Sequence, residues 1–528
     1  MSGVTTVLLL VVLATAVATG ARHWSIPAPS LLVVAGVLVE LLPFVPRFQV
    51  PPEVISVAVL PPLLYASAEE ISWRELRAVW KPVTVLALGL VLASAFVVGA
   101  IAALLTPLPV SMAFVLGAVL ASTDPVAVTA LGRRLSLPAK VQTLVQSESL
   151  FNDATSLVLF KVAVGIAGTA GAAGAFSPTG AGGQFLLLAG GGAAVGGAAA
   201  AVVAAIRVRT EDPVLETVIA LVTPYAAYVV AEDLHTSGVT AVVVAGVVLG
   251  AQGHRLTNAR IRLQVHAVYR TVVFMLESVV FAVIGLELPG MIRDLDAAES
   301  GWFWQALLIA GAVLLVRLFW VFPLAMFLQR RRAAAGGPPV NWRVPAVMTW
   351  AGTRGVMPLA AALTVPLLAP DGQPMPYREL VLVLTTAVVA CTLIVQGFTL
   401  APVVRAAGIA LEPEATAREE ARAAKVVLRV SLERLESLLD AEAVQEVVAD
   451  RMRRDLEARL DHARLRLSDE EPPEDEATVL AYRRLRRDLI AVESAELHRL
   501  YADRRISEAT RAGLQHALDL EEAGLGEL

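Results

Sequence analysis

Thirteen apolar stretches of about membrane length lie between residues 4 and 402, and they constrain the fold more than any other feature. A hydrocarbon core about 30 Å thick needs about 20 apolar residues in a helix. Because lipid offers no partner to unpaired backbone groups, such stretches fold as helices. Of the 528 residues, 56% are hydrophobic and only 17% charged, which excludes a soluble protein. We therefore predict an all-α polytopic membrane protein with about 13 transmembrane helices.

The basic residues between these stretches predict the orientation of the chain. Residues 4–20 follow Met1 with no basic segment, so we interpret them as a spanning helix and not as a removable signal peptide. One alternating set of loops carries seventeen Lys and Arg residues: Arg22, Arg74, Arg77, Lys81, Arg133, Arg134, Lys140, Arg207, Arg209, Arg255, Arg260, Arg262, Arg270, Arg330, Arg331, Arg332 and Arg343. The other set has three, Arg47, Arg293 and Arg378. The positive-inside rule then predicts an N-terminus outside and a cytoplasmic C-terminal region.

The composition changes near residue 410. A membrane domain over 1–405 is followed by a segment, 411–528, that is dense in charges of both signs and is predicted to form amphipathic helices. A proline-rich break at 471–474 divides this tail into two parts. No binding motif is visible in it, which favours a helical appendage over a ligand-binding regulatory domain. The single cysteine, Cys391, excludes an intrachain disulfide and gives no sign of redox chemistry.

Two of the apolar stretches are interrupted in the middle. The fifth, 110–131, contains Asp124-Pro125, and the twelfth, 344–368, contains Gly352-Thr353-Arg354-Gly355 before Pro358. If spans one to six form one half and spans eight to thirteen the other, each break falls in the fifth span of its half. The loop charges give the two halves opposite orientations. This pattern indicates inverted repeats of six helices, with a site near the bilayer midplane.

The sixth stretch, 141–165, carries polar side chains where a membrane helix is normally apolar. At helical spacing Glu148 lies one turn from Asn152, and Ser149 one turn from Asp153. An ionisable side chain at the bilayer centre costs about 3 kcal/mol even on the lenient insertion scale. A helix with two such residues is predicted to be built around an ion or a proton.

The candidate ligands are those with oxygen atoms. Asp153 is the first candidate for direct contact with Na+, a hard ion, and Asp124, Thr123 and Ser149 offer further oxygens. Backbone carbonyls freed near Pro125 would add to them. The alternative for Asp124 is a cap on the half-helix that begins at Pro125. We expect Asn152 to orient the site and not to bind.

Other charges at membrane depth need partners. Arg317, in the middle of the eleventh stretch, is the best available partner for Glu148. Arg354, at the second break, either places a fixed positive charge near the site or caps exposed carbonyls. Lys161 and Glu277 are accessory candidates: Lys161 could extend to the interface, and Glu277 could belong to a second pair or to a gate.

These residues resemble those of the monovalent cation:proton antiporter family, with its bacterial NhaP-type and animal NHE-type sodium/proton antiporters. The resemblance covers most of residues 1–405 and rests on Leu60-Pro61-Pro62-Leu63-Leu64, Thr123-Asp124-Pro125, Glu148-Ser149-Leu150-Phe151-Asn152-Asp153, Arg317 and Gly352-Thr353-Arg354-Gly355. It implies an NhaA/NapA-like fold and a homodimer. In that fold spans one to three and eight to ten form a dimer-side domain, and spans four to six and eleven to thirteen form a moving core.

The resemblance also implies roles. The residue matching Asp153 binds cation and proton in turn, those matching Thr123, Asp124 and Ser149 complete the coordination, and the pair matching Glu148 and Arg317 holds the core together. An Asn-Asp pair at 152–153, in place of Asp-Asp, resembles the electroneutral branch. Lys161 does not match the core lysine of the electrogenic branch, which belongs to a later helix.

We therefore predict a secondary antiporter, not an enzyme, that exchanges Na+, with Li+ or K+ as further candidates, for H+. It would use no cofactor and no nucleic acid, would lie in membrane lipid, and would serve pH and sodium homeostasis from the bacterial inner membrane. Three alternatives remain: a K+/H+ antiporter, a sensor or channel that keeps the fold without transport, and an intramembrane protease with an Asp124–Asp153 dyad. The last lacks a Gly-x-Gly-Asp motif.

Overall fold

The structure is a computed structural model of the 528-residue chain. It describes residues 12, 15–17, 19, 28–41, 54–123, 139–169, 178–293, 295, 299, 301–334, 341–369, 372–408, 413–440, 445–465, 467, 475–503 and 505–524. Most of the first predicted span, 4–20, lies outside these residues, as do Asp124 and Pro125. The chain divides into two compact units, Met1–Ala410 and Leu411–Leu528.

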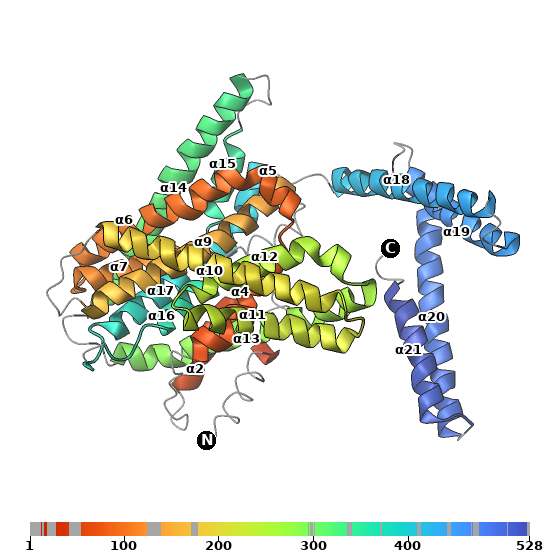
Figure 1. Ribbon diagram of the computed structural model, residues 1–528, viewed down its shortest axis with the longest axis horizontal. Helices are drawn as coiled ribbons and strands as arrows, with labels where there is room; N and C mark the ends of the chain where they lie inside the picture. Colours follow the sequence, from red (N-terminus) through yellow and green to blue (C-terminus); the bar gives the residue numbers. More distant parts are fainter. Residues whose placement is uncertain are drawn as a thin grey trace. The chain divides into compact units, whose positions relative to one another are not determined.

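The described part of the first unit is built from helices joined by turns and short non-helical segments (Figure 1). Its N-terminal half contains α2 (Ala28–Glu40), η1 (Ile55–Val59), α4 (Leu60–Glu69), α5 (Trp73–Thr84), η2 (Val85–Leu90), α6 (Val91–Leu105), α7 (Val110–Val119) and α9 (Ala139–Thr169). Its second half contains α10 (Pro178–Arg207), α11 (Pro213–Asp233), α12 (Gly238–Leu256), α13 (Ala259–Arg293), α14 (Trp302–Ala334), α15 (Arg343–Trp350), α16 (Val356–Leu363) and α17 (Arg378–Ala407).

Seven helices in the described residues are long and apolar enough to cross a membrane, judged by length and composition. They are Trp73–Leu105, Thr143–Gly168, Gly182–Arg207, Pro213–Asp233, Ala259–Arg293, Trp302–Arg331 and Arg378–Gln396. The first joins α5, η2 and α6 into one continuous rod. Four shorter apolar helices, Leu31–Glu40, Val57–Glu69, Val110–Val119 and Gly238–Gly253, fall on other predicted stretches. The chain is therefore a multi-pass membrane protein.

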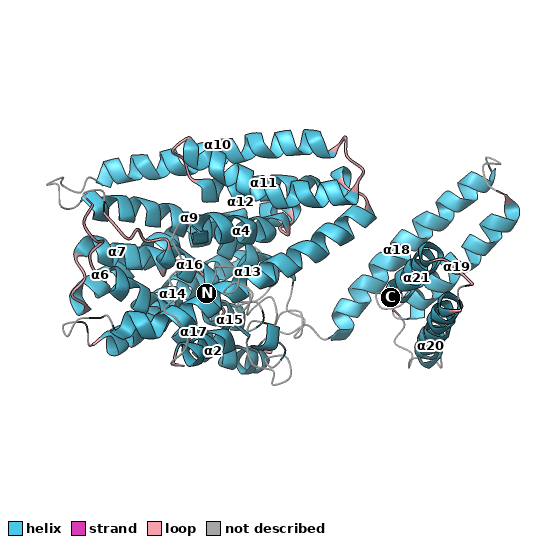
Figure 2. Cartoon of the chain, turned by 90° about the horizontal axis from the view of Figure 1, so that it is seen from below, coloured by secondary structure: helices cyan, strands magenta, loops and turns pink. Residues whose placement is uncertain are grey.

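Contacts between helices divide this unit into two groups. One group contains α2, α4, α10, α11, α12 and α13, and Figure 2 shows α10 and α11 along one edge of the unit. The other contains α5, η2, α6, α7, α9, α14, α15, α16 and α17. The groups meet where α9 contacts α10 and α12, and where α13 contacts α16 and α17. All the residues of the candidate site that the structure describes lie in the second group.

Both interrupted stretches stop being helical near their middle. The last α-helical residue of α7 is Val119, and Thr123 is the last residue described before a gap at 124–138. In the twelfth stretch α15 ends at Trp350 and α16 begins at Val356, so Ala351–Gly355 form a buried non-helical segment. Such a segment is tolerated at membrane depth only inside protein, where other groups can satisfy its backbone.

The glycine-rich helix α10 packs closely against α12. A Cβ atom added to Gly196 would lie 2.2 Å from the backbone oxygen of Ala241, so only glycine fits this approach. This contact agrees with the expectation that small residues between 165 and 205 serve close helix packing.

The second unit consists of two helical hairpins. In one, α18 (Pro413–Asp440) packs against α19 (Glu446–Leu465), and in the other, α20 (Asp475–Ala502) packs against α21 (Glu508–Gly524). The second hairpin is joined at its open end by Arg486, which donates to Glu521 Oε1 at 2.6 Å and Oε2 at 2.8 Å. Arg486 also donates to Glu493 at 3.0 Å. The predicted break at 471–474 lies outside the described residues.

The Arg486–Glu521 contact gives the second hairpin a pH dependence. Hydrogen bonds from Arg486 lower the pKa of Glu521 below its usual range. A lowered pKa in the folded state stabilises the hairpin at pH values above the ordinary carboxyl range, and this stabilisation is lost as the pH falls through that range. We expect Arg486→Gln in the full-length protein to speed hydrogen exchange in 508–524 modestly at pH 7, because exposed ion pairs contribute little.

The difference in the hydrogen-exchange rate of 508–524 between Arg486→Gln and the parent should shrink as the pH falls toward 4. Hydrogen exchange measured by mass spectrometry would check this, with Arg453→Gln, which removes an exposed intrahelical partner of Asp450, as the matched control. If the exchange rates differed as much at acid pH as at pH 7, ionised Glu521 would not be what stabilises the hairpin through Arg486.

Candidate functional site

The polar stretch of α9 lies inside the protein and not against lipid. Glu148 is 1% exposed, Ser149 2%, Asn152 1% and Asp153 6%. The helix continues without a break through all four residues, and none of them caps an end. Their burial therefore serves contacts with other helices or with a transported ion.

Three side chains of α9 hold the C-terminal end of α7. Asn152 Nδ2 donates to Thr123 Oγ1, and Asn152 Oδ1 accepts from the Thr123 backbone N–H at 3.3 Å. Ser149 Oγ donates to the Thr123 carbonyl, and Ser156 Oγ donates to the Ala118 carbonyl at 2.6 Å. A helix that ends inside a membrane leaves its last carbonyls without intrahelical donors. Here side chains of α9 donate hydrogen bonds to some of these carbonyls.

Arg354, from the other interruption, donates to two more of these carbonyls. Its guanidinium is 1% exposed and donates from Nη1 to the Ala121 carbonyl at 2.9 Å and to the Ser122 carbonyl. The negative end of one broken helix thus receives the positive charge carried by the break of the other. These bonds join residues that are 233 and 232 positions apart in the chain.

Glu148 faces Arg317 of α14. Arg317 Nη1 donates to Glu148 Oε1 at 2.5 Å, and Nη2 donates to Oε2 at 3.1 Å, so the pair is bidentate. Nε and Nη2 of Arg317 also donate to the Met348 carbonyl, at 3.3 and 3.1 Å. That carbonyl lies in the last turn of α15, where no intrahelical donor remains. One guanidinium therefore joins α9, α14 and α15.

Gly352 makes room for this arrangement. A Cβ atom at Gly352 would lie 2.2 Å from Arg317 Nε and 2.4 Å from Cδ. Any larger residue would displace the guanidinium from Glu148 and Met348. The glycine of the second break is thus explained by the close approach of a neighbouring side chain.

Asp153 lies one turn beyond Ser149 on the same face of α9, beside the contacts that hold Thr123. The carbonyls of Ala121, Ser122 and Thr123, which precede Pro125, accept hydrogen bonds from Arg354 and Ser149. Asp124 follows directly after Thr123 but lies outside the described residues.

The accessory candidates lie elsewhere. Lys161 is bonded to Glu232 at the end of α11, and its ammonium group is 5.9 Å from the centre of the Tyr228 ring. Glu232 also accepts from the Gly238 backbone N–H at 2.9 Å. Lys161 thus connects α9 to the other helix group. Glu277 is half-buried in the middle of α13.

Sequence reasoning missed a second buried charge cluster at the end of α10. Arg207 is 3% exposed and lies 3.3 Å from Glu216 Oε2, a carboxylate of α11 that is fully buried, and 3.9 Å from Glu69 Oε1 of α4. In the sequence Arg207 resembles any basic residue at the end of a span, and Glu216 any acid in a first helical turn. Nothing in either pattern indicates burial.

Comparison with known proteins supports a class of ion transporter. The family described as sodium/hydrogen exchanger, transmembrane, matches residues 7–406. A Na+/H+ exchanger of Mycobacterium tuberculosis is 33% identical over 406 residues, 76% of this chain and 74% of the relative. Another, YjcE of Escherichia coli, is 30% identical and is aligned over 98% of this chain and 97% of its own length, which includes the tail.

Further relatives carry names that specify cations. A protein of Bacillus pumilus named as a sodium, potassium, lithium and rubidium/H+ antiporter is 28% identical over 71% of this chain and 57% of its own. The solved structure of the sodium proton antiporter MjNhaP1 from Methanocaldococcus jannaschii superposes with a TM-score of 0.62 at 21% identity, and covers 76% of this chain and 97% of that one. This likeness shows a common fold.

A helical membrane unit that matches this family over residues 7–406 is an ion transporter and not an enzyme. The chain belongs to the sodium/hydrogen exchanger family.

Proposed function

We propose that the protein is a secondary antiporter that exchanges Na+ for H+ at one carboxylate, Asp153, by alternating access. The observation that carries the proposal is the burial of Asp153 beside the contacts between α9 and the interrupted helix α7. The family membership and the names of the relatives support the same exchange. The direct test is the replacement of Asp153, for which a large loss of flux is expected.

Competition at Asp153 provides the coupling. A carboxylate surrounded by protein is neutralised either by a proton or by a monovalent cation, and the two exclude each other. The empty, charged site is costly to move through a low-dielectric region, whereas the occupied site is neutral. Only an occupied site crosses readily, so each Na+ that moves one way is matched by a proton that moves the other.

Thr123, Asp124 and Ser149 are proposed to complete the cation site with Asp153. Carboxylate and hydroxyl oxygens suit a hard ion such as Na+. Asn152 is proposed to position Thr123 by bonding both to its hydroxyl and to its backbone N–H. In this scheme Asn152 acts through Thr123 and does not contact the ion.

The fixed charges are proposed to set the electrostatics of the site. Glu148 is paired with Arg317, so it does not compete for the ion. Arg354 leaves a positive charge against the end of α7, which raises the barrier to a second cation near Asp153.

The cation is proposed to be Na+, with Li+ also accepted. K+/H+ exchange is the alternative, because the name of the Bacillus pumilus relative includes potassium among its cations. Flux driven by each cation in turn would decide, because selectivity depends on ligand distances and cavity size. Flux with K+ and none with Na+ or Li+ would overturn the Na+ assignment.

The finer architecture is also a proposal. About thirteen spans in two inverted repeats of six, with an NhaA/NapA-like fold, are supported by the likeness to MjNhaP1 and by the two helix groups. The group containing α9 and α14 would be the moving core, and the other would form a homodimer. The N-terminus would lie outside and the tail in the cytoplasm, with the protein in the plasma membrane of a bacterial cell, consistent with its bacterial relatives.

Electroneutral exchange is expected because the site presents Asn152 next to a single carboxylate, Asp153. In proteoliposomes with a clamped membrane potential, Na+-driven proton flux should change less than about two-fold over 100 mV. One net charge that crosses the membrane would be biased by about 2.3 kcal/mol over the same range. A rate that follows the clamped voltage would show that net charge moves, and liposomes containing Asp153→Asn give the leak baseline.

A further inference from the structure

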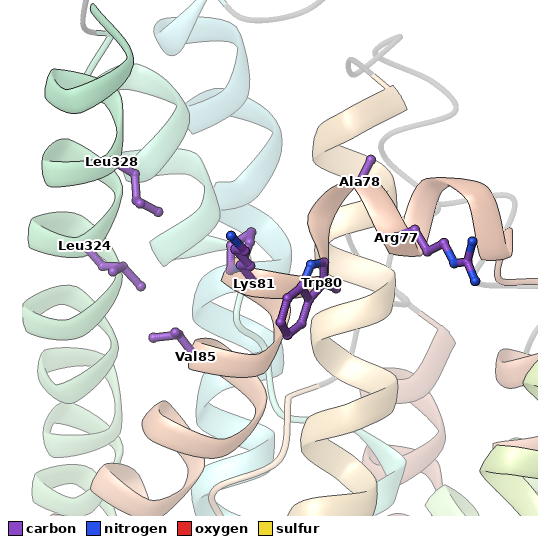
Figure 3. A pocket seen from close by; sticks show the side chains of 8 residues that line it. Arg77, Ala78, Trp80, Lys81, Val85, Leu324 and Leu328 are labelled. Carbon is purple, nitrogen blue, oxygen red and sulfur yellow. The ribbon is translucent and has the colours of Figure 1, made fainter. Parts of the chain in front are cut away.

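A groove lies between α5 and α14, on the surface of the second helix group. Its volume is about 300 Å³. It is lined on one side by Arg77, Trp80, Lys81 and Val85 and on the other by Leu324 and Leu328. Figure 3 shows Leu324 and Leu328 of α14 facing Val85, with Lys81 and Trp80 beside them. None of these residues takes part in the site around Asp153.

The mouth of the groove is positively charged and aromatic. Lys81 lies 5.9 Å from the centre of the Trp80 ring, and Arg77 lies 5.1 Å from that of Trp73. Among the ion pairs of the described residues, none includes Arg77 or Lys81. On α14 Arg331 lies one turn beyond Leu328 on the same face. Both walls therefore end in cations without a carboxylate partner in the described structure.

The interior of the groove is apolar and continues along the helices. Beyond Val85, Leu88 and Leu92 lie further along the rod formed by η2 and α6, and each of the three is at least 40% exposed. Trp320 of α14 packs against the same rod, since its ring lies 2.6 Å from where a Cβ on Gly89 would be. The groove is thus charged at one end and lined by apolar side chains along its length.

These features match one class of ligand. Tryptophan beside a basic residue is typical of the membrane–water interface, and a row of exposed aliphatic side chains on a spanning helix faces acyl chains. A soluble anion would use the cations but not the apolar strip, and a zwitterionic lipid would gain little from the unpaired cations. We propose that the groove between α5 and α14 binds an anionic phospholipid, with its phosphate at Lys81 and Arg77 and one acyl chain against Val85, Leu324 and Leu328.

The binding has a mechanical consequence. α5 and η2 contact α9, and α14 carries Arg317, which is bonded to Glu148 of α9. A lipid between α5 and α14 would hold together two of the helices that support the candidate site. The orientation proposed above places the groove in the cytoplasmic leaflet. The binding of lipid to the groove does not depend on that orientation.

The test measures lipid binding to the full-length protein purified in detergent. We expect phosphatidylglycerol to remain bound in native mass spectrometry and to raise the thermal unfolding temperature, whereas phosphatidylcholine and inorganic phosphate at the same concentration should do neither. Because each basic residue near a membrane surface contributes about five-fold in affinity for anionic lipid, Arg77→Gln with Lys81→Gln should weaken binding about 25-fold. Val85→Trp, which fills the groove without a change of charge, should also reduce lipid retention.

Arg209→Gln is the matched control. It removes an exposed arginine two residues after the end of α10, outside the groove, and should leave lipid retention unchanged. An equal loss of lipid in Arg209→Gln, or no loss in Val85→Trp, would show general attraction to basic surface and overturn the proposal. Stabilisation by inorganic phosphate would assign the site to a soluble anion. Because the readout is binding, its failure would leave the proposed exchange at Asp153 untouched.

Discussion

Asp153→Asn is expected to reduce Na+-driven proton flux at least about 100-fold, to the background of empty vesicles. The substituted carboxamide keeps the size of the side chain but can neither release a proton nor carry the negative charge that a cation neutralises. Without a group that binds Na+ and H+ in turn, nothing in the core couples the movement of one ion to that of the other. Flux would be measured in everted vesicles with a pH-sensitive dye, on addition of NaCl, LiCl or KCl.

A loss of flux has meaning only if the protein still folds. Replacing a buried carboxylate by a neutral amide removes the cost of a desolvated charge, so Asp153→Asn should unfold at a temperature at least as high as that of the parent. Thermal unfolding in detergent checks this directly. A variant that is unstable and inactive would be replaced by Asp153→Glu, which keeps the carboxylate and should retain exchange with an altered apparent affinity for Na+.

The matched control is Asp233→Asn, the same chemical change at an exposed residue at the end of α11. It should leave flux within about two-fold of the parent. Retained Na+-driven exchange in Asp153→Asn, with normal expression, would remove Asp153 from the site and with it the proposed coupling.

The sequence predicted the class of fold because lipid restricts what an apolar stretch can do. The spans and the break at Ala351–Gly355 follow from hydropathy, proline and glycine, which act locally. Glu148 and Arg317 could be considered together because few charges occur within apolar stretches, so a buried acid has few candidate partners. The structure has these two side chains in contact although they are 169 residues apart in the chain.

Contacts to backbone atoms could not be predicted in this way. The acceptors of Arg354 are the carbonyls of Ala121 and Ser122, and every residue carries a carbonyl. Likewise the clash that excludes a side chain at Gly352 depends on the path of Arg317, a residue of another helix. Arg354 and Gly352 both lie in the break at Ala351–Gly355, which the sequence pattern predicts. Their contact partners depend on how the helices pack.

Near the ends of spans, sequence alone does not distinguish a buried charge from a solvated one. Glu232 and Arg207 lie where a chain normally leaves the membrane, and there a charged residue needs no explanation. In the structure Glu232 binds Lys161 across the two helix groups, and Arg207 is buried beside Glu216. The hydropathy of a stretch fixes its depth only to within a turn or two, which is the difference between a solvated and a buried charge.

The second prediction with a large effect concerns the Glu148–Arg317 pair. Arg317→Gln should destabilise the protein by about 3–5 kcal/mol, because it leaves the Glu148 carboxylate buried without a counter-charge and removes a donor from the Met348 carbonyl. Glu148→Gln should cost a similar amount, since it leaves a guanidinium buried in the same way. Thermal unfolding of the full-length protein in one detergent would rank the variants.

The double variant Glu148→Gln with Arg317→Gln separates the pair from its surroundings. It removes both charges together, so it should be more stable than either single variant even though it carries more substitutions. Arg464→Gln is the matched control, because Arg464 and Asp461 are both exposed and their bond at 2.8 Å should contribute less than about 1 kcal/mol. If the double variant lost the sum of the two single losses, the residues would act independently and the pairing would not be what stabilises the junction. If the double variant recovered stability but not flux, the pair would also be needed to keep α9 and α15 in register around Asp153, since Arg317 is the group that bonds to both helices.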